Sequence, residues 1–267
     1  MTTPPVARRL DLASVLLRIE RSKMHLADFE ARAKPLLAEC RDAVISDYDE
    51  QRSEYVVRIG RTPPIPPLLS VIIGEAIHNL RVSLDYLMWQ LVIACGETPN
   101  ENTAFPILMV SPTPNRHGQI HVNVSPSLPK AIRRKLDEIQ PYKLVHPRNH
   151  QLAVLHNLNI VDKHREMLFT IIDANKIGWF GDADLRTVNP GPYEGGSEIC
   201  RFAFPGYAYP PGRVKGSVQF SVTPMFDLCL REPAAGAWDR TIGASDLMGI
   251  LLKYVEEEVL PRFKGYF

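Results

Sequence analysis

The sequence has few cysteines, and their spacing suits neither a metal site nor a disulfide framework. Only four occur in 267 residues, namely Cys40, Cys95, Cys200 and Cys229, and no two form a CxxC pair. This spacing argues against a zinc knuckle and against a small domain held together by disulfides. We therefore expect buried, reduced thiols and a protein of the cytoplasm.

Long apolar runs and an excess of charge of one sign are also missing. The longest apolar stretch, Leu68–Ile73, ends at Gly74 and Glu75, well short of the roughly 20 residues that a membrane-spanning helix needs. The N-terminus lacks the basic flank and apolar block of an export signal. A formal net charge of +1 gives the chain as a whole no electrostatic attraction for nucleic acid or anionic lipid. We expect no membrane association, and only local contacts with any nucleic acid.

Helical patterns are abundant in the first two thirds of the sequence. Apolar residues at three- and four-residue spacing predict helices over 10–55, 70–96, 129–139, 149–172 and 244–263. Pro35 is expected to kink or break the first of these, and Ser127 to cap the third. The proline-rich segment 62–67 cannot be helical and serves as a connector. We expect residues 97–129 to form a loop with one or two short strands.

The character of the sequence changes after the fourth helix. Residues 175–232 are rich in glycine and proline and contain alternating runs at 199–204 and 217–222, which predict antiparallel strands. The expected fold is therefore α+β and mainly helical. A helical bundle over 1–172 carries the polar motifs, and 173–267 form a small antiparallel sheet with a closing helix, packed as one unit with the bundle.

The helix predicted at 70–93 has an unusual polar half. His78, Arg81 and Asp85 lie at i, i+3 and i+7 and so form one stripe, in which Arg81 and Asp85 can pair across a turn. Asn79 and Tyr86 lie on the same half, which contains fewer Lys and Glu than a solvated face normally has. This pattern predicts either a buried hydrogen-bond network that fixes helices in register or a site lined by these groups.

The helix predicted at 149–169 is apolar nearly all round, with polar exceptions at regular spacing. His150, Asn157 and His164 repeat every seven residues and so share one side. The last turn reads Asp162-Lys163-His164-Arg165, where basic groups also suit the negative end of the helix dipole. His156 and Asn157 repeat the His-Asn-Leu order found at 78–80, which suggests paired polar layers on the two helices.

Five short motifs together resemble a family of uncharacterised bacterial and phage proteins over roughly residues 10–172. In order, they are GEAIHNLR at 74–81, LD at 84–85, FPI at 105–107, IQPY at 139–142 and DKHR at 162–165. The family's helix usually reads Arg-x-x-Leu-Asp-His, which is similar to the Arg-x4-6-His signature of HEPN-type helical domains. Many of those domains belong to RNA-cleaving toxins or defence proteins, in which the arginine and histidine act on the scissile phosphate at a dimer interface.

The resemblance implies a set of site residues. The family arginine falls on Arg81, but the histidine position holds Tyr86, and a tyrosine with an ordinary pKa near ~10 is a poor proton shuttle at neutral pH. The implied catalytic residues are therefore Arg81, Asp85 and either His78 or His164, acting on RNA in a homodimer. The implied ligand-binding residues around them are Asn79, Tyr86, His156, Asn157, Asp162, Lys163 and Arg165.

Other chemistries lack their motifs. The sequence has no GxSxG elbow, no glycine-rich phosphate loop and no HExxH pair, so we expect no metal and no cofactor. A second hypothesis is a non-catalytic interaction or ligand-binding protein, in which the polar helix pair is structural. The sequence leaves open which of the two applies, and therefore whether the protein is an enzyme.

Overall fold

The structure is a computed structural model of the chain. It describes residues 12–112, 128–167, 169–173, 178–180, 183–189, 191–204, 221–223, 226–231 and 242–267. The cap expected at Ser127 and most of the strand expected at 217–222 lie outside these ranges.

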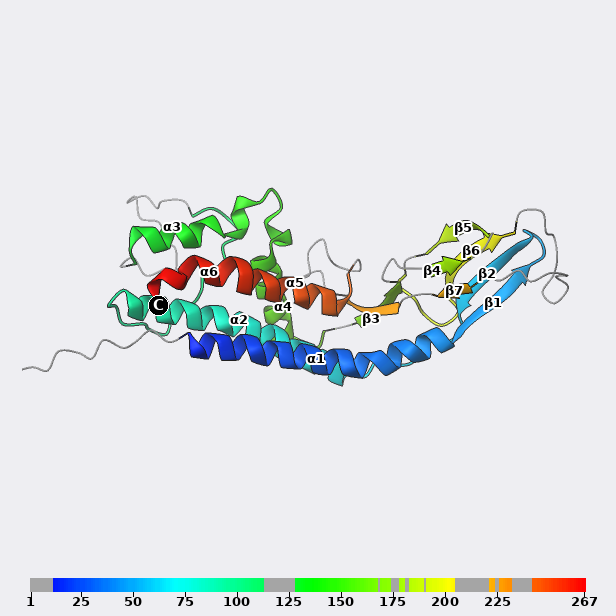
Figure 1. Ribbon diagram of the computed structural model, residues 1–267, viewed down its shortest axis with the longest axis horizontal. Helices are drawn as coiled ribbons and strands as arrows, with labels where there is room; N and C mark the ends of the chain where they lie inside the picture. The colour runs from blue at the N-terminus through cyan, green and yellow to red at the C-terminus, as the bar shows by residue number, and fades with distance from the viewer. Residues whose placement is uncertain are drawn as a thin grey trace, which may run out of the picture.

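Two long helices form the base of the molecule. α1 (Ala13–Asp42) and α2 (Leu68–Ala94) lie side by side and run antiparallel (Figure 1). The Ser22 hydroxyl is buried between them and donates to the Ala76 carbonyl oxygen at 2.7 Å. Pro35 lies within α1, which continues to Asp42, so the break predicted there does not occur.

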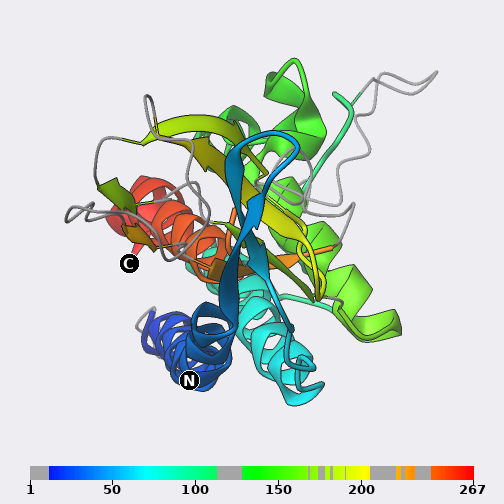
Figure 2. The ribbon, with the colours of Figure 1, turned by 90° about the vertical axis from the view of Figure 1, so that its right-hand side faces the viewer.

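A four-stranded antiparallel sheet lies at the far end of α1, on the right of Figure 1. Its strands, in spatial order, are β1 (Val44–Asp49), β2 (Glu54–Ile59), β6 (Glu198–Ala203) and β5 (Asp184–Val188). Figure 2 shows the β1–β2 hairpin running beside β6. The prediction of helix up to residue 55 was therefore wrong, because α1 ends at Asp42 and residues 44–59, which include several β-branched and aromatic residues, form an antiparallel hairpin.

The sheet is consequently not confined to the last third of the chain, although the α+β, mainly helical class is confirmed. Two further strand pairs are β3 (Phe169–Asp173) with β8 (Phe226–Leu230) and β4 (Gly178–Phe180) with β7 (Ser221–Thr223). β3 occupies residues predicted as the end of the fourth helix. The sequence Phe-Thr-Ile-Ile is rich in β-branched residues, which favour a strand.

The remaining helices lie between residues 130 and 266. They are α3 (Lys130–Glu138), α4 (Gln151–His164), α5 (Ala244–Lys253), a π-helical turn (Tyr254–Val259) and α6 (Leu260–Phe263), with short 3-10 turns at Pro141–Lys143, Pro147–Asn149 and Lys264–Tyr266. Within the described parts of the chain, none of the helices has the length and hydropathy needed to cross a membrane.

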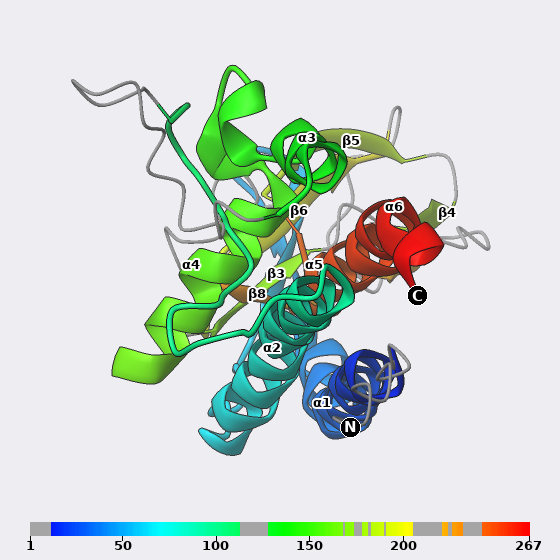
Figure 3. The ribbon, with the colours of Figure 1, turned by 90° about the vertical axis from the view of Figure 1, so that its left-hand side faces the viewer.

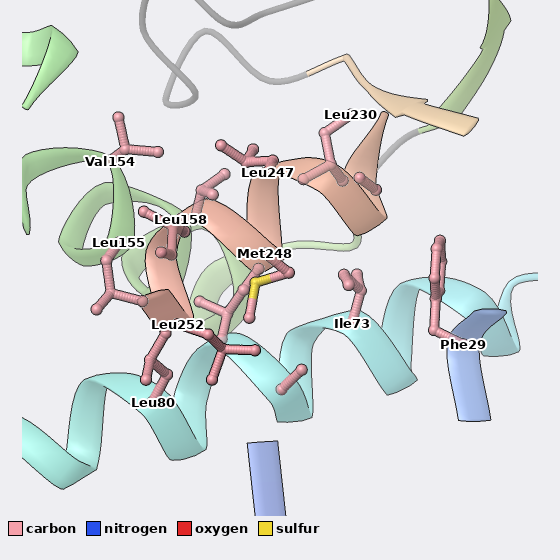
Figure 4. Close-up of a cluster of buried hydrophobic side chains, with 14 of the residues drawn as sticks. Phe29, Ile73, Leu80, Val154, Leu155, Leu158, Leu230, Leu247, Met248 and Leu252 are labelled. Atoms are coloured by element: carbon pink, nitrogen blue, oxygen red, sulfur yellow. The ribbon is translucent and has the colours of Figure 1, made fainter. Parts of the chain in front are cut away.

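α2 is central to the core. It contacts α1, α4 and α5 (Figure 3). Figure 4 shows Leu80 of α2 beside Leu155 and Leu158 of α4 and Leu252 of α5, and all four side chains are buried. Because α2 is buried against three neighbours, polar groups on it must find partners on those neighbours.

Candidate functional site

Polar side chains of α2 and α4 meet along one line, which we call the polar seam. Its members are Gly74, His78, Arg81 and Asp85 of α2 and His156, Asn159 and Asp162 of α4. The contacts run in opposite order along the two helices. Asp162 lies on Gly74, the His78 Nδ1 lies 3.1 Å from the Asn159 Oδ1, and the charges of Arg81 and Asp85 act on His156.

Gly74 allows the close approach at one end of the seam. A Cβ at this position would lie only 1.9 Å from the Asp162 Oδ1 and 2.6 Å from its Cγ. Glycine is therefore required because the Asp162 carboxyl occupies the space of a side chain. Burial raises the pKa of Asp162, and the negative charge of Glu75 adds to the increase, while His78 and Lys163 oppose it.

Arg81 and Asp85 form the predicted pair, at 2.6 Å between Nη1 and Oδ1. The Arg81 side chain is only 8% exposed, whereas that of Asp85 is 33% exposed. Both also bind Phe105. The Phe105 N–H donates to the Asp85 Oδ1 at 2.9 Å, and the Arg81 Nη2 donates to the Phe105 carbonyl oxygen at 3.2 Å. The pair therefore clamps the backbone of the FPI motif onto α2.

Gln140 holds the same segment from its other side. Its buried side chain accepts from the Leu108 N–H at 2.9 Å and donates to the carbonyl oxygens of Pro106 and Leu136 at 3.1 and 2.8 Å. The FPI and IQPY motifs are thus two halves of one clamp. Both motifs are visible in the sequence, but the contact between them is not. The sequence signal that could have indicated this contact is Gln140, which lies between Ile139 and Pro141 directly after an amphipathic helix.

His156 is the histidine that the fold brings to Arg81 and Asp85. Its side chain is half-buried, and its buried Nδ1 has no hydrogen-bond partner within the described part of the chain. Burial lowers the pKa of His156, the positive charges of Arg81 and Lys163 lower it further, and Asp85 opposes them. The ring is therefore uncharged at neutral pH.

The other histidines occupy different places. His78 lies in the seam, but its Nδ1 is engaged with Asn159. His164 is exposed at the C-terminal end of α4, about two turns or roughly 12 Å along the axis from His156. It therefore lies at the Gly74 end of the seam, away from Arg81. Of the four predicted catalytic residues, the fold brings Arg81, Asp85 and His78 to the seam and leaves His164 outside.

Asn79 and Tyr86 face α1 instead. Arg18 of α1 donates to the Asn79 Oδ1 at 2.9 Å and to the Tyr86 hydroxyl at 3.1 Å, and its guanidinium carbon lies 5.2 Å from the centre of the Tyr86 ring. Five helical positions separate Arg81 from Tyr86, so their side chains point about 140° apart. Tyr86 is therefore engaged with Arg18 on the α1 side of α2. Arg18 was not singled out from the sequence, where it is one of many charges on an amphipathic helix.

The remaining predicted ligand-binding residues surround α4. Asn157 is half-buried, and Lys163 and Arg165 are exposed. Lys163 adds positive charge near both His156 and Asp162. Over the residues that the structure describes, no group of three or more His, Cys, Asp or Glu side chains has an arrangement suited to a metal ion.

Comparisons with known proteins were made at three levels. No family model, no curated protein and no solved structure matches the chain. The functional argument therefore depends on the geometry of the seam.

Proposed function

We propose that this protein cleaves RNA without a metal, using His156 as the base and Arg81 as the positive group of a HEPN-like centre. The observation that carries the proposal is the uncharged, half-buried imidazole of His156 within electrostatic reach of the Arg81–Asp85 pair. The resemblance of the 74–85 helix to HEPN-type domains supplies the substrate class.

The chemistry needs only these groups. A neutral imidazole can accept the proton of an RNA 2′-hydroxyl, whose oxygen then attacks the adjacent phosphorus while the bond to the 5′-oxygen breaks. Solvent protonates the departing 5′-oxygen. Arg81 and the exposed Lys163 supply positive charge near the phosphate as negative charge develops on it. Asp85 holds Arg81 in place through the 2.6 Å ion pair.

The test compares two histidines on the same helix. Purified parent, His156→Gln and His164→Gln are incubated with mixed RNAs in the presence of a chelator. We expect cleavage by the parent and by the His164→Gln control, and none by His156→Gln. Background-level cleavage by the parent, or equal cleavage by all three proteins, would refute the proposal.

The pH profile gives a second readout. Because the pKa of His156 is lowered below its ordinary value of 6.5, the base stays neutral through mildly acidic conditions. Cleavage should therefore stay near its maximum between pH 7 and 8 and decrease as the pH falls below the ordinary histidine pKa of 6.5. If cleavage begins to decrease above pH 7, the group that titrates is not His156, and the proposed base is wrong.

We further propose that the protein works as a cytoplasmic homodimer, as the resemblance to HEPN-type domains implies. Light scattering over a range of protein concentrations tests the dimer. A measured mass equal to that of one chain at all concentrations would refute the homodimer.

A second candidate function is favoured by the burial of Arg81. Its side chain is 8% exposed, and its guanidinium already binds Asp85 and the Phe105 carbonyl oxygen. On this basis the seam is structural, and the protein is a non-catalytic interaction or ligand-binding module. This candidate predicts that Arg81→Met lowers stability strongly and that the parent cleaves no RNA. The same RNA assay therefore separates the two candidates.

A further inference from the structure

His150 joins two helices through both nitrogens of its ring. It immediately precedes α4, and its Nδ1 accepts the Leu152 N–H at 3.1 Å, which makes it the N-cap of that helix. Its Nε2 lies 3.3 Å from the Tyr254 hydroxyl, where the π-helical turn begins, and the two rings meet edge to face at 5.4 Å. The residue is 7% exposed.

These bonds require an uncharged ring. An Nδ1 that accepts the Leu152 N–H carries no proton, so the single ring proton is on Nε2 and is donated to the Tyr254 hydroxyl oxygen. Protonation would convert Nδ1 into a donor and remove the cap. It would also place a positive charge at the positive end of the α4 dipole, where a cation is disfavoured.

Within the described part of the chain, no charged side chain of the adjoining elements offsets this penalty. The first turn of α4, Gln151–Val154, has no ionisable residue, and Arg148 in the preceding 3-10 turn is exposed. From the C-terminal helix, Tyr254 faces the ring, and Glu258 and Arg262 act on Tyr254. Burial raises the pKa of Tyr254 to about 12, so its hydroxyl keeps its proton. Burial alone lowers the pKa of His150.

We propose that His150 is a pH-sensitive latch, which holds the N-terminal turn of α4 against the C-terminal helix when neutral and releases it when protonated. The latch lies at the start of the helix that also carries His156, Asn159 and Asp162. Release would therefore loosen the α4 side of the polar seam from its end nearest His156. The inference is independent of whether the seam is catalytic.

The test measures the latch in the intact protein. Nitrogen-15 NMR of labelled histidine reports the tautomer and titration of His150, and amide hydrogen exchange reports the protection of Leu152 from pH 7.5 to 4.5, corrected for the intrinsic exchange rate. The amide of Leu158, deeper in α4, serves as the internal reference. Matched variants are His150→Asn, which can cap a helix without titrating, and His146→Asn, which removes an exposed histidine four positions earlier.

In the parent and in His146→Asn, acid should lower the protection of Leu152 relative to Leu158 by about fivefold, the factor that corresponds to loss of one N-cap. In His150→Asn the ratio should be independent of pH. Three results would each overturn the latch: a His150 proton on Nδ1 at neutral pH, equal loss of protection at Leu152 and Leu158, or the same acid response in His150→Asn. The first two are measured in the parent and decide the question even where the variant fails to fold.

Discussion

Replacing Gly74 by alanine tests the polar seam at its tightest contact. Alanine is the better helix former by about 1 kcal/mol, so the substitution would stabilise an ordinary helical position. Here the new Cβ would lie 1.9 Å from the Asp162 Oδ1, far inside the 3.4 Å at which ordinary contact begins. Overpacking of this kind costs about 1–3 kcal/mol. Because both the carboxyl oxygen and the Cγ must move and the helix gain of about 1 kcal/mol offsets part of the cost, we expect a net loss of up to about 2 kcal/mol in the free energy of unfolding.

Gly249 provides the matched control. It also lies inside a helix, but a Cβ there would meet nothing within 4 Å. Gly249→Ala should therefore stabilise the protein by up to about 1 kcal/mol. Urea denaturation of the parent and both variants measures the difference. Stabilisation by Gly74→Ala equal to that by Gly249→Ala would refute the contact between α2 and Asp162.

Asp162→Ala shows whether the carboxyl is the cause. Burial already disfavours the charged form of Asp162, so removing the side chain should cost little by itself. In the double variant the alanine at position 74 no longer clashes. We expect the two substitutions to be coupled by about 1–2 kcal/mol in the favourable direction, whereas sites without contact would be additive.

Three other substitutions probe the clamp and the histidine. Asp85→Ala leaves the buried Arg81 without its partner and should lower the free energy of unfolding in urea by about 2–3 kcal/mol. Gln140→Ala removes three buried hydrogen bonds and should cost about 2–3 kcal/mol in the same assay, and a loss below about 0.5 kcal/mol would argue against the clamp. The unfolded chain binds a proton to His156 more readily than the folded chain does, so stability should be constant above pH 7 and decrease below about pH 6.5. His156→Leu should raise the melting temperature at pH 5.5 and reduce this decrease, and an unchanged pH profile would contradict the lowered pKa.

Much of the α2 side of the seam could be predicted from local spacing. Residues at i, i+3 and i+7 share a helix face whatever surrounds them, and a pair at i, i+4 is within reach of one ion pair. The prediction for His78, Arg81 and Asp85 depended only on these rules, and the Arg81–Asp85 pair is confirmed. The rules say nothing about which helix lies opposite. His156 was consequently placed among the ligand-binding residues, and His164 among the catalytic ones.

The contacts that local spacing missed are all distant in sequence. The β1–β2 hairpin pairs with β6 across most of the chain, and Gln140 and Arg81 reach the 105–108 segment from different helices. Non-local pairing leaves no periodic signal at either partner. In the hairpin, charged residues also interrupt the apolar alternation, and the helical pattern before it runs almost to its first residue.

In the part of the chain that the structure describes, most polar groups of the seam have hydrogen-bond partners, but one buried nitrogen does not. This difference bears on whether the seam has only a structural role. His78 and Asn159 satisfy each other, Asp162 packs on Gly74, and Arg81 and Asp85 bind each other and the Phe105 backbone. A seam that only fixes two helices in register gains nothing from a buried nitrogen without a partner, which costs about 1–3 kcal/mol. The Nδ1 of His156 is such an atom within the described residues. An unoccupied lone pair on a neutral imidazole can accept a proton, which is the role that the proposed function gives to this ring.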